Sequence, residues 1–202
     1  MSRLPFLSQR TVLGAAVGLW VIGLATGAAA LLRYSSTPGP TGYAASQWPE
    51  NAVVPRSPGR PTLVMLAHPQ CPCTRASLNE LARLLVHGDV DAWVLFLLPD
   101  GAKPEWEKTG LWKLAASIPG VHAVADENGQ LASAFGAETS GHVLFYDANG
   151  ILQFSGGITS MRGHEGSSPG GDAILAHLLG REAAADQALT FGCPLKGRSE
   201  TR

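Results

Sequence analysis

The sequence predicts an α/β protein, in which a mixed sheet is flanked by helices and preceded by an N-terminal transmembrane helix. Three observations predict it. Residues 11–32 contain no charged side chain. From residue 61 onward, short apolar runs alternate with segments in which apolar residues recur at helical spacing. Two apolar runs then flank Asp147-Ala148-Asn149-Gly150, a pattern typical of a β-hairpin. Alternating units of this kind predict a mixed sheet with helices on both faces.

The apolar segment 11–32 is long enough to cross a bilayer, because about 20 helical residues span the hydrocarbon core. A cleaved signal peptide is the alternative, because signal peptidases cut at small residues and Ala28-Ala29-Ala30 supplies such residues. The apolar region of a signal peptide is normally ~7–15 residues, so the length favours an anchor. We therefore expect a single-pass membrane protein.

Basic residues predict the orientation of this anchor. Arg3 and Arg10 precede the segment, and Arg33 follows it. The positive-inside bias places residues 1–10 in the cytoplasm and exports the remainder to the periplasmic or extracytoplasmic side. Thiols in such a compartment tend to be oxidised unless a dedicated system keeps them reduced.

Composition limits the classes of function. The formal net charge is −1 and no basic stripe is present, which argues against a nucleic-acid partner. The chain has three cysteines, and an odd number is unusual for a stabilising disulfide framework. The cysteines therefore indicate chemistry rather than structure.

Residues 33–60 are expected to form a Pro-rich linker. Proline at this density prevents a regular helix and favours an extended, semi-rigid spacer that holds the domain away from the bilayer. Trp48 and Tyr43 are interpreted as linker residues. The prolines of this stretch are at positions 38, 40, 49, 55 and 58.

The domain is expected over residues 61–186, followed by a tail over 187–202. The apolar run 62–68 fits a buried strand. A helix is expected from about Thr74, because apolar residues there recur at helical spacing. A second buried strand, 92–98, ends at Pro99-Asp100-Gly101. The apolar positions of the helix are Leu78, Leu81, Ala82 and Leu85.

The following elements are shorter. Apolar residues at helical spacing predict a helix over 105–118 that ends at Pro119-Gly120. The remaining pattern predicts the hairpin and a last helix, for which Asp172 is the expected N-cap. The expected ranges are a strand over 121–125, a helix over 131–135, hairpin strands over 142–146 and 151–154, and a helix over 172–179.

Cys71-Pro72-Cys73 lies where the first strand gives way to the first helix of the domain. A helix N-terminus stabilises a thiolate. Residues two apart lie roughly 200° apart around a helix, whereas a disulfide needs Cβ atoms within about 3.5–4.5 Å. A Cys71–Cys73 bond therefore requires Cys71 to lie outside the helix. Pro72 favours that arrangement, because it disfavours α geometry at Cys71 and suits the first helical position.

These constraints predict Cys71 at the N-cap as the exposed nucleophile and Cys73 in the first turn as its resolving partner. Cys193, in the tail before Pro194, is a third candidate. The pairings 71–73, 71–193 and 73–193 are all open. Cys193 could pin the tail, or it could resolve if the tail folds back over the first helix.

Four further side chains are candidates for lining the site. His68 immediately precedes the thiol loop, where it could stabilise a thiolate, ligate a metal or be structural. His142 could approach the thiols from the hairpin. Arg162 and His164 lie on the loop that leaves the last strand, where they either rim the site or are simply exposed. At the rim, Arg162 would lower a thiol pKa or bind an acidic substrate.

The element order with a thiol pair after the first core strand resembles the thioredoxin superfamily over residues 61–186. Thioredoxins carry Trp-Cys-x-x-Cys, so one residue is missing here and no Trp precedes Cys71. The resemblance places Gly141 at their cis-proline position; glycine tolerates close backbone approach, so a substrate chain could lie there. Four segments more narrowly resemble membrane-anchored RedB-type thioredoxin-like proteins: His68–Thr74, Gly156–Thr159, Arg162–His164 and Phe191–Pro194.

The leading interpretation is a membrane-tethered, exported thiol–disulfide oxidoreductase that acts on protein thiols or disulfides without a cofactor. A copper-binding protein or metallochaperone is the first alternative, in which Cys71, Cys73 and His68 form a soft site suited to Cu(I). The second alternative is a catalytically quiet thioredoxin-like binding domain.

Overall fold

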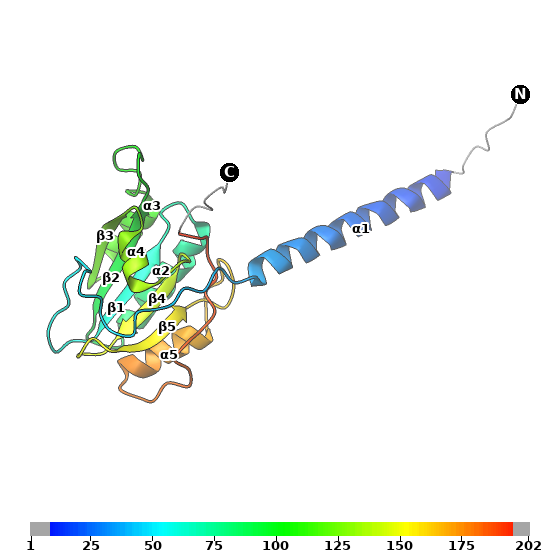
Figure 1. Cartoon of the computed structure of the whole chain (residues 1–202). Helices are drawn as coiled ribbons and strands as arrows, with labels where there is room; N and C mark the ends of the chain where they lie inside the picture. Colours follow the sequence, from blue (N-terminus) through cyan, green and yellow to red (C-terminus); the bar gives the residue numbers. More distant parts are fainter. Residues whose placement is uncertain (1–8, 196–202) are drawn as a thin grey trace, which may run out of the picture. The chain divides into compact units, whose positions relative to one another are not determined.

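The structure is a computed structural model that describes residues 9–195 (Figure 1). Arg3, most of the expected cytoplasmic segment 1–10 and the end of the expected tail lie outside the described residues. The chain divides into two compact units, one up to Ser36 and one from Thr37 onward.

The first unit contains helix α1, Gln9–Ser36, which includes the whole expected anchor 11–32. Among residues 9–195, it is the one helix long and apolar enough to cross a membrane. None of its residues is buried. Its length and composition fit a membrane span and equally a signal sequence near the N-terminus.

The second unit is built on a five-stranded sheet with the strand order β3-β2-β1-β4-β5. Strands β1, β2 and β3 are parallel, and β4 and β5 are antiparallel to their neighbours. The central strand β1 is buried at every residue, as its uninterrupted apolar run predicts. The expected thioredoxin-like mixed sheet is confirmed. Its strands are β1 Thr62–Ala67, β2 Asp91–Leu98, β3 Val121–Glu127, β4 His142–Tyr146 and β5 Leu152–Gly157.

Helices cover both faces of this sheet. Apolar side chains of α2, α3 and α5 pack on one face, together with Met65 and Phe145. Apolar side chains of α4 pack on the other face, together with Leu66 and Tyr146. The alternation along each strand thus divides the core into two layers. The helices are α2 Pro72–Leu85, α3 Gly110–Ser117, α4 Gln130–Phe135 and α5 Pro169–Leu178.

Two helices begin at different residues from those expected. The helix predicted over 105–118 begins only at Gly110, where Thr109 is the N-cap and accepts a hydrogen bond from the Leu111 N–H. Glu105 has φ +61°, which a right-handed helix excludes. The last helix begins before Asp172, because Ser168 is its N-cap and Pro169 occupies its first turn.

The expected Pro-rich linker 33–60 differs in the structure: residues 33–36 belong to α1, and residues 37–60 belong to the same compact unit as the sheet. Trp48 packs edge-on against Phe135 and Tyr146, with ring centroids 5.1 and 5.3 Å away. The Tyr146 hydroxyl donates a hydrogen bond to the Ala45 carbonyl at 2.9 Å, and Val54 is buried. Proline prevents a helix here, but an extended segment can still bury its aromatic side chains on a sheet face.

Replacing Trp48 with alanine should lower the free energy of unfolding by about 2 kcal/mol, because two aromatic contacts and their buried area are lost. Tyr43→Ala is the matched control, since Tyr43 lies in the same segment and is 96% exposed. Denaturant unfolding followed by circular dichroism measures both variants. Equal stabilities for the two variants would contradict this packing role.

Candidate thiol site

Cys71 lies between β1 and α2, as the sequence predicts. It is the N-cap residue of α2, with extended backbone angles of φ −85° and ψ 118°, and Pro72 follows in the first turn. The Cys71 N–H donates to the His68 carbonyl at 3.1 Å, and the Thr74 N–H donates to the Cys71 carbonyl at 3.1 Å. Cys71 therefore lies outside the helix, whereas Cys73 lies in its first turn.

A buried hydroxyl pair joins the thiol loop to the start of β4. The Oγ atoms of Thr74 and Ser140 are 2.9 Å apart. Ser140 Oγ accepts a hydrogen bond from the His68 N–H at 2.9 Å, and Thr74 Oγ1 donates to the His68 carbonyl at 3.2 Å. Sequence reasoning missed both hydroxyls. The only local signal was the position of Ser140 just before a buried strand.

Gly141 brings β4 close to the thiol loop. Its N–H donates to the Leu66 carbonyl at 2.7 Å, at the end of β1. Its φ of +87° is a conformation that glycine adopts without strain. A Cβ at this position would lie 2.9 Å from the Ser77 hydroxyl of α2. Glycine therefore allows the close approach that places Ser140 beside Thr74.

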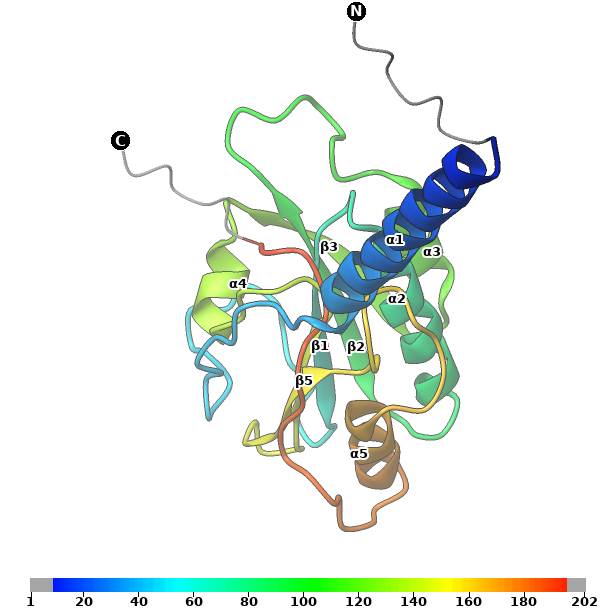
Figure 2. The same ribbon diagram turned by 90° about the vertical axis from the view of Figure 1, so that its right-hand side faces the viewer.

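The tail folds back onto this loop and brings the third thiol to the site. The Ser140 N–H donates to the Cys193 carbonyl at 2.8 Å, and Thr139 forms an antiparallel bridge with Pro194. Figure 2 shows the red tail running alongside β5, which it meets through a bridge between Ser155 and Gln187. All three cysteines are free thiols.

Arg162, which the sequence places either at the rim of the site or exposed on its loop, lies near Cys73 and the tail. Its Nη1 donates a hydrogen bond to the Gly192 carbonyl, immediately before Cys193. Its positive charge lowers the pKa of both Cys73 and Cys193, against stronger opposing effects. His164, on the same loop, is exposed and hydrogen-bonds Met161 through its backbone.

Cys71 is the one thiol of the three whose pKa lies below its ordinary value. Burial raises the pKa of Cys71, but hydrogen bonding from the Cys193 thiol and from nearby N–H groups lowers it by more. These N–H groups belong to Cys73, Thr74 and Cys193. Two of these N–H groups, those of Cys73 and Thr74, lie in the first turn of α2, where a helix N-terminus favours a thiolate.

The other two thiols are held neutral. Burial raises the pKa of Cys73, and the Cys71 thiolate raises it further. Burial and the neighbouring Cys71 raise the pKa of Cys193 to about 12. Cys71 is therefore the first of the three thiols to ionise as the pH rises.

The expectation that Cys71 is exposed is wrong. Cys71 is 1% exposed and Cys73 is 8% exposed, whereas Cys193 is only half-buried. The N-terminus of α2 and the tail both contact Cys71, and the tail position is a long-range packing result that local spacing does not encode.

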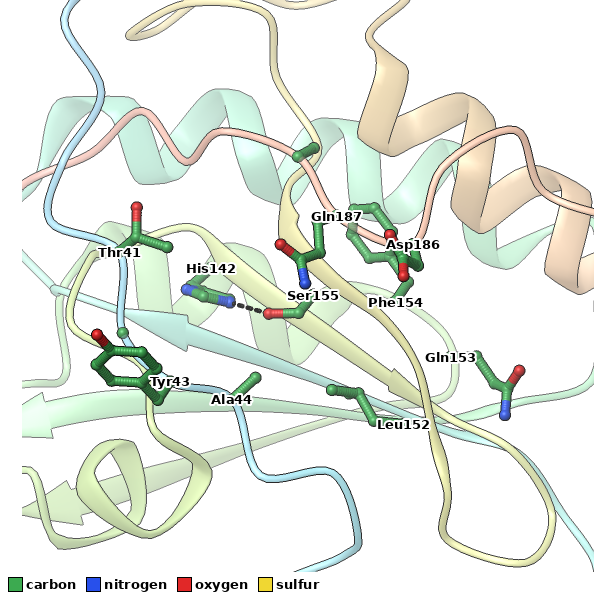
Figure 3. A pocket seen from close by; sticks show the side chains of 12 residues that line it. Thr41, Tyr43, Ala44, His142, Leu152, Gln153, Phe154, Ser155, Asp186 and Gln187 are labelled. Carbon is green, nitrogen blue, oxygen red and sulfur yellow. Dashed lines mark hydrogen bonds between the residues drawn. The ribbon is translucent and has the colours of Figure 1, made fainter.

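His68 and His142 do not face the thiols as a pair. The His68 Nδ1 accepts a hydrogen bond from the Gln70 N–H at 3.2 Å, and its ring packs edge-on against Trp106. His142 points toward Ser155 in a separate cavity of about 410 Å³ between β5 and the segments around Thr41 and Gln187 (Figure 3). Its Nε2 lies 2.8 Å from Ser155 Oγ.

Within residues 9–195, no three His, Cys, Asp or Glu side chains are arranged to hold a metal ion. The set Cys71, Cys73 and His68 considered for copper is therefore not brought together as a ligand group. His68 instead lines a cavity of about 430 Å³ beside the tail. The other lining residues of this cavity are Leu97, Pro99, Asp100, Trp106, Asn128, Pro194 and Leu195.

No protein-family model matches the sequence, and no curated protein matches it. An uncharacterized conserved protein from Geobacillus kaustophilus has a similar structure, with a TM-score of 0.57 and 21% identity over 82% of this chain and 93% of that one. A hypothetical protein from Sinorhizobium meliloti has a TM-score of 0.57 and 20% identity over 82% and 98% of the two chains. A secreted disulfide oxidoreductase from Mycobacterium tuberculosis has a TM-score of 0.42 and 12% identity over 61% and 83%, which is too low to support an argument. These similarities show a shared fold alone.

A pH titration of thiolate absorbance should show that Cys71 ionises at lower pH than the other two thiols, so Cys71→Ser should remove the lowest step. Cys193→Ala should raise the pKa of Cys71, because the hydrogen bond from the Cys193 side chain is lost. Cys73→Ala is the matched comparison: the Cys73 thiol also hydrogen-bonds Cys71, but the side chain that lowers the pKa of Cys71 most is that of Cys193, so the effect of Cys73→Ala should be smaller. An equal effect of the two substitutions would contradict this assignment.

Burial lowers the pKa of His142 from 6.5 to about 4. As the pH falls, His142 therefore takes up a proton at a higher pH in the unfolded chain than in the folded chain. The free energy of unfolding is thus highest above pH 6.5 and decreases as the pH falls from 6.5 toward 4. Between pH 7 and pH 5, the wild type should lose about 2 kcal/mol more stability than His142→Asn. Ser155→Ala keeps the imidazole and should behave as the wild type does. Parallel losses in wild type and His142→Asn would contradict the shift.

Proposed function

We propose that this chain is an exported, membrane-tethered thiol–disulfide oxidoreductase with Cys71 as its nucleophile. The observation that carries the proposal is the position of Cys71 at a helix N-terminus, where its pKa is lowered, beside two thiols whose pKa values are raised. A thiolate is the form of cysteine that attacks disulfides, and a neighbouring thiol allows the resulting mixed disulfide to be resolved.

The reaction transfers two electrons. The Cys71 thiolate attacks one sulfur of a partner disulfide, and the other sulfur leaves as a thiolate. A second thiol of this chain then attacks Cys71 and releases the first partner sulfur. The partner is reduced to a dithiol, and this chain retains a disulfide. The reverse sequence oxidises a partner dithiol, so the direction depends on the relative reduction potentials.

The partners proposed for this site are protein thiols and disulfides. The cavity of about 430 Å³ adjoins the thiol loop through His68 and the tail through Pro194. Its lining also includes the aromatic ring of Trp106. A partner side chain bound there would lie next to the Cys71 loop.

Export and tethering rest on the N-terminal helix. Helix α1 has the length and composition of a membrane span, and Arg10 and Arg33 flank its apolar part. The anchor would keep the thiol domain at the membrane on the periplasmic or extracytoplasmic side. Three of the segments that resemble RedB-type proteins supply Cys71, Arg162 and Cys193 to the same site.

The full-length protein in detergent should show a reversible dithiol–disulfide couple in glutathione buffers and should catalyse reduction of a protein disulfide such as insulin in the presence of dithiothreitol. Cys71→Ser should reduce this activity to the uncatalysed level, because no other thiol of the site has a lowered pKa. Tyr43→Ala, on an exposed side chain, is the control and should remain active.

Two results would contradict the oxidoreductase. Tight Cu(I) binding that Cys71→Ser abolishes, without a reversible couple, would favour copper delivery. If the protein shows neither a reversible dithiol–disulfide couple nor copper binding, the remaining interpretation is a binding domain.

A further inference from the structure

We propose that Cys193, rather than Cys73, forms the disulfide with Cys71. Residues 190–195, called the arm below, hold Cys193 in position for this bond. This inference rests on the proposed oxidoreductase function, because it specifies which thiol resolves the mixed disulfide. Three observations carry it: the fixed path of the tail, the contact of Cys193 with Cys71, and the helical position of Cys73.

The arm is held by backbone hydrogen bonds along its length. The Gly39 N–H donates to the Thr190 carbonyl at 2.8 Å. The Ser140 N–H donates to the Cys193 carbonyl at 2.8 Å, and the Leu195 N–H donates to the Glu138 carbonyl at 2.8 Å. These contacts place the arm antiparallel to the residues that precede β4. Its position is therefore specified on both sides of Cys193.

Gly192 shows how closely the arm approaches. A Cβ at this position would lie 1.9 Å from the Ser140 carbonyl oxygen, so a side chain there would displace the arm. The carbonyl of Gly192 accepts a hydrogen bond from Arg162, which comes from the loop after β5. Arg162 is thus a positioning residue that joins the arm to the opposite side of the site.

This placement directs Cys193 at Cys71. Both the thiol and the backbone N–H of Cys193 interact with the Cys71 sulfur. Cys193 is also the most exposed of the three thiols, so it lies where a partner bound to Cys71 would enter and leave.

Cys73 is less able to form the bond because it belongs to α2. A Cys71–Cys73 disulfide would close a small ring that contains Pro72, whose φ is fixed. Closing that ring would disturb the first turn, which the bond from the Thr74 N–H to the Cys71 carbonyl begins. Cys193 lies on a separate extended segment and can adjust without opening a helix.

The charges of the site permit resolution by Cys193 without distinguishing it from Cys73, because Cys71 raises and Arg162 lowers the pKa of both thiols. The Cys71 thiolate contributes to the raised pKa of Cys193, whereas Arg162 acts to lower it. Once Cys71 is bonded to a partner sulfur, its negative charge is gone while Arg162 remains. Cys193 then ionises more readily at the stage when it must attack.

The resolving step is a thiol–disulfide exchange. Cys193 loses its proton, which passes to the departing partner thiolate, and the Cys193 sulfur attacks the Cys71 sulfur. The bond between Cys71 and the partner breaks, and a Cys71–Cys193 bond forms. The partner disulfide has gained two electrons from these two cysteines, and Cys73 remains a thiol throughout.

Disulfide mapping tests the pairing directly. The full-length wild type in detergent is oxidised with oxidised glutathione, its remaining thiols are alkylated, and its peptides are analysed by mass spectrometry. We expect a peptide pair that joins Cys71 to Cys193, with Cys73 alkylated. A Cys71–Cys73 or Cys73–Cys193 pair as the main product would overturn the proposal.

Matched serine variants test the step in turnover. With insulin as the oxidant, Cys193→Ser should prolong the lifetime of the Cys71–insulin mixed disulfide at least about tenfold, whereas Cys73→Ser should resolve it as the wild type does. The reverse pattern would overturn the proposal while leaving the oxidoreductase function intact. A wild type that forms no mixed disulfide or internal disulfide would instead refute the function itself. Mapping on the unmodified protein keeps the result independent of whether a variant folds.

Discussion

The thiol site depends on one backbone constraint, the break between β1 and α2 that Pro72 imposes at Cys71. Pro72 occupies the first turn of α2, and Cys71 is extended at the N-cap. If Cys71 were helical, its sulfur would turn away from Cys73 and from the start of β4. The break instead leaves it at the positive end of the helix, facing the residues that hold the tail.

The segments on either side of the folded core complete the site from outside the sheet. The Pro-rich segment packs through Trp48 onto the face that carries Tyr146, and its Gly39 pairs with the tail at Thr190. The tail then pairs with the residues before β4 and carries Cys193 to Cys71. Segments far apart in the sequence therefore determine which atoms surround the Cys71 thiol and how small its solvent exposure is.

Burial and charge assign the three thiols different properties. All three are penalised by burial, but only Cys71 receives enough hydrogen bonding to lower its pKa. Burial is the largest cause of the raised pKa values of Cys73 and Cys193, and repulsion from an ionised Cys71 adds to it. His142, on the other face of the sheet, is neutral for the simpler reason that burial penalises its charged form.

Local rules of sequence are enough to specify several parts of this protein. Apolar runs specify the strands, Asp147–Gly150 specifies the hairpin, and Pro72 specifies the N-cap geometry of Cys71. Three other features arise from long-range packing: Trp48 packs on the sheet, Ser140 and Thr74 join the thiol loop to the start of β4, and Cys71 is buried next to Cys193. Proline and periodicity rules describe the conformation of a segment, whereas these contacts join residues far apart in the chain. Their geometry follows from the register of the sheet and the path of the tail, which no local pattern encodes.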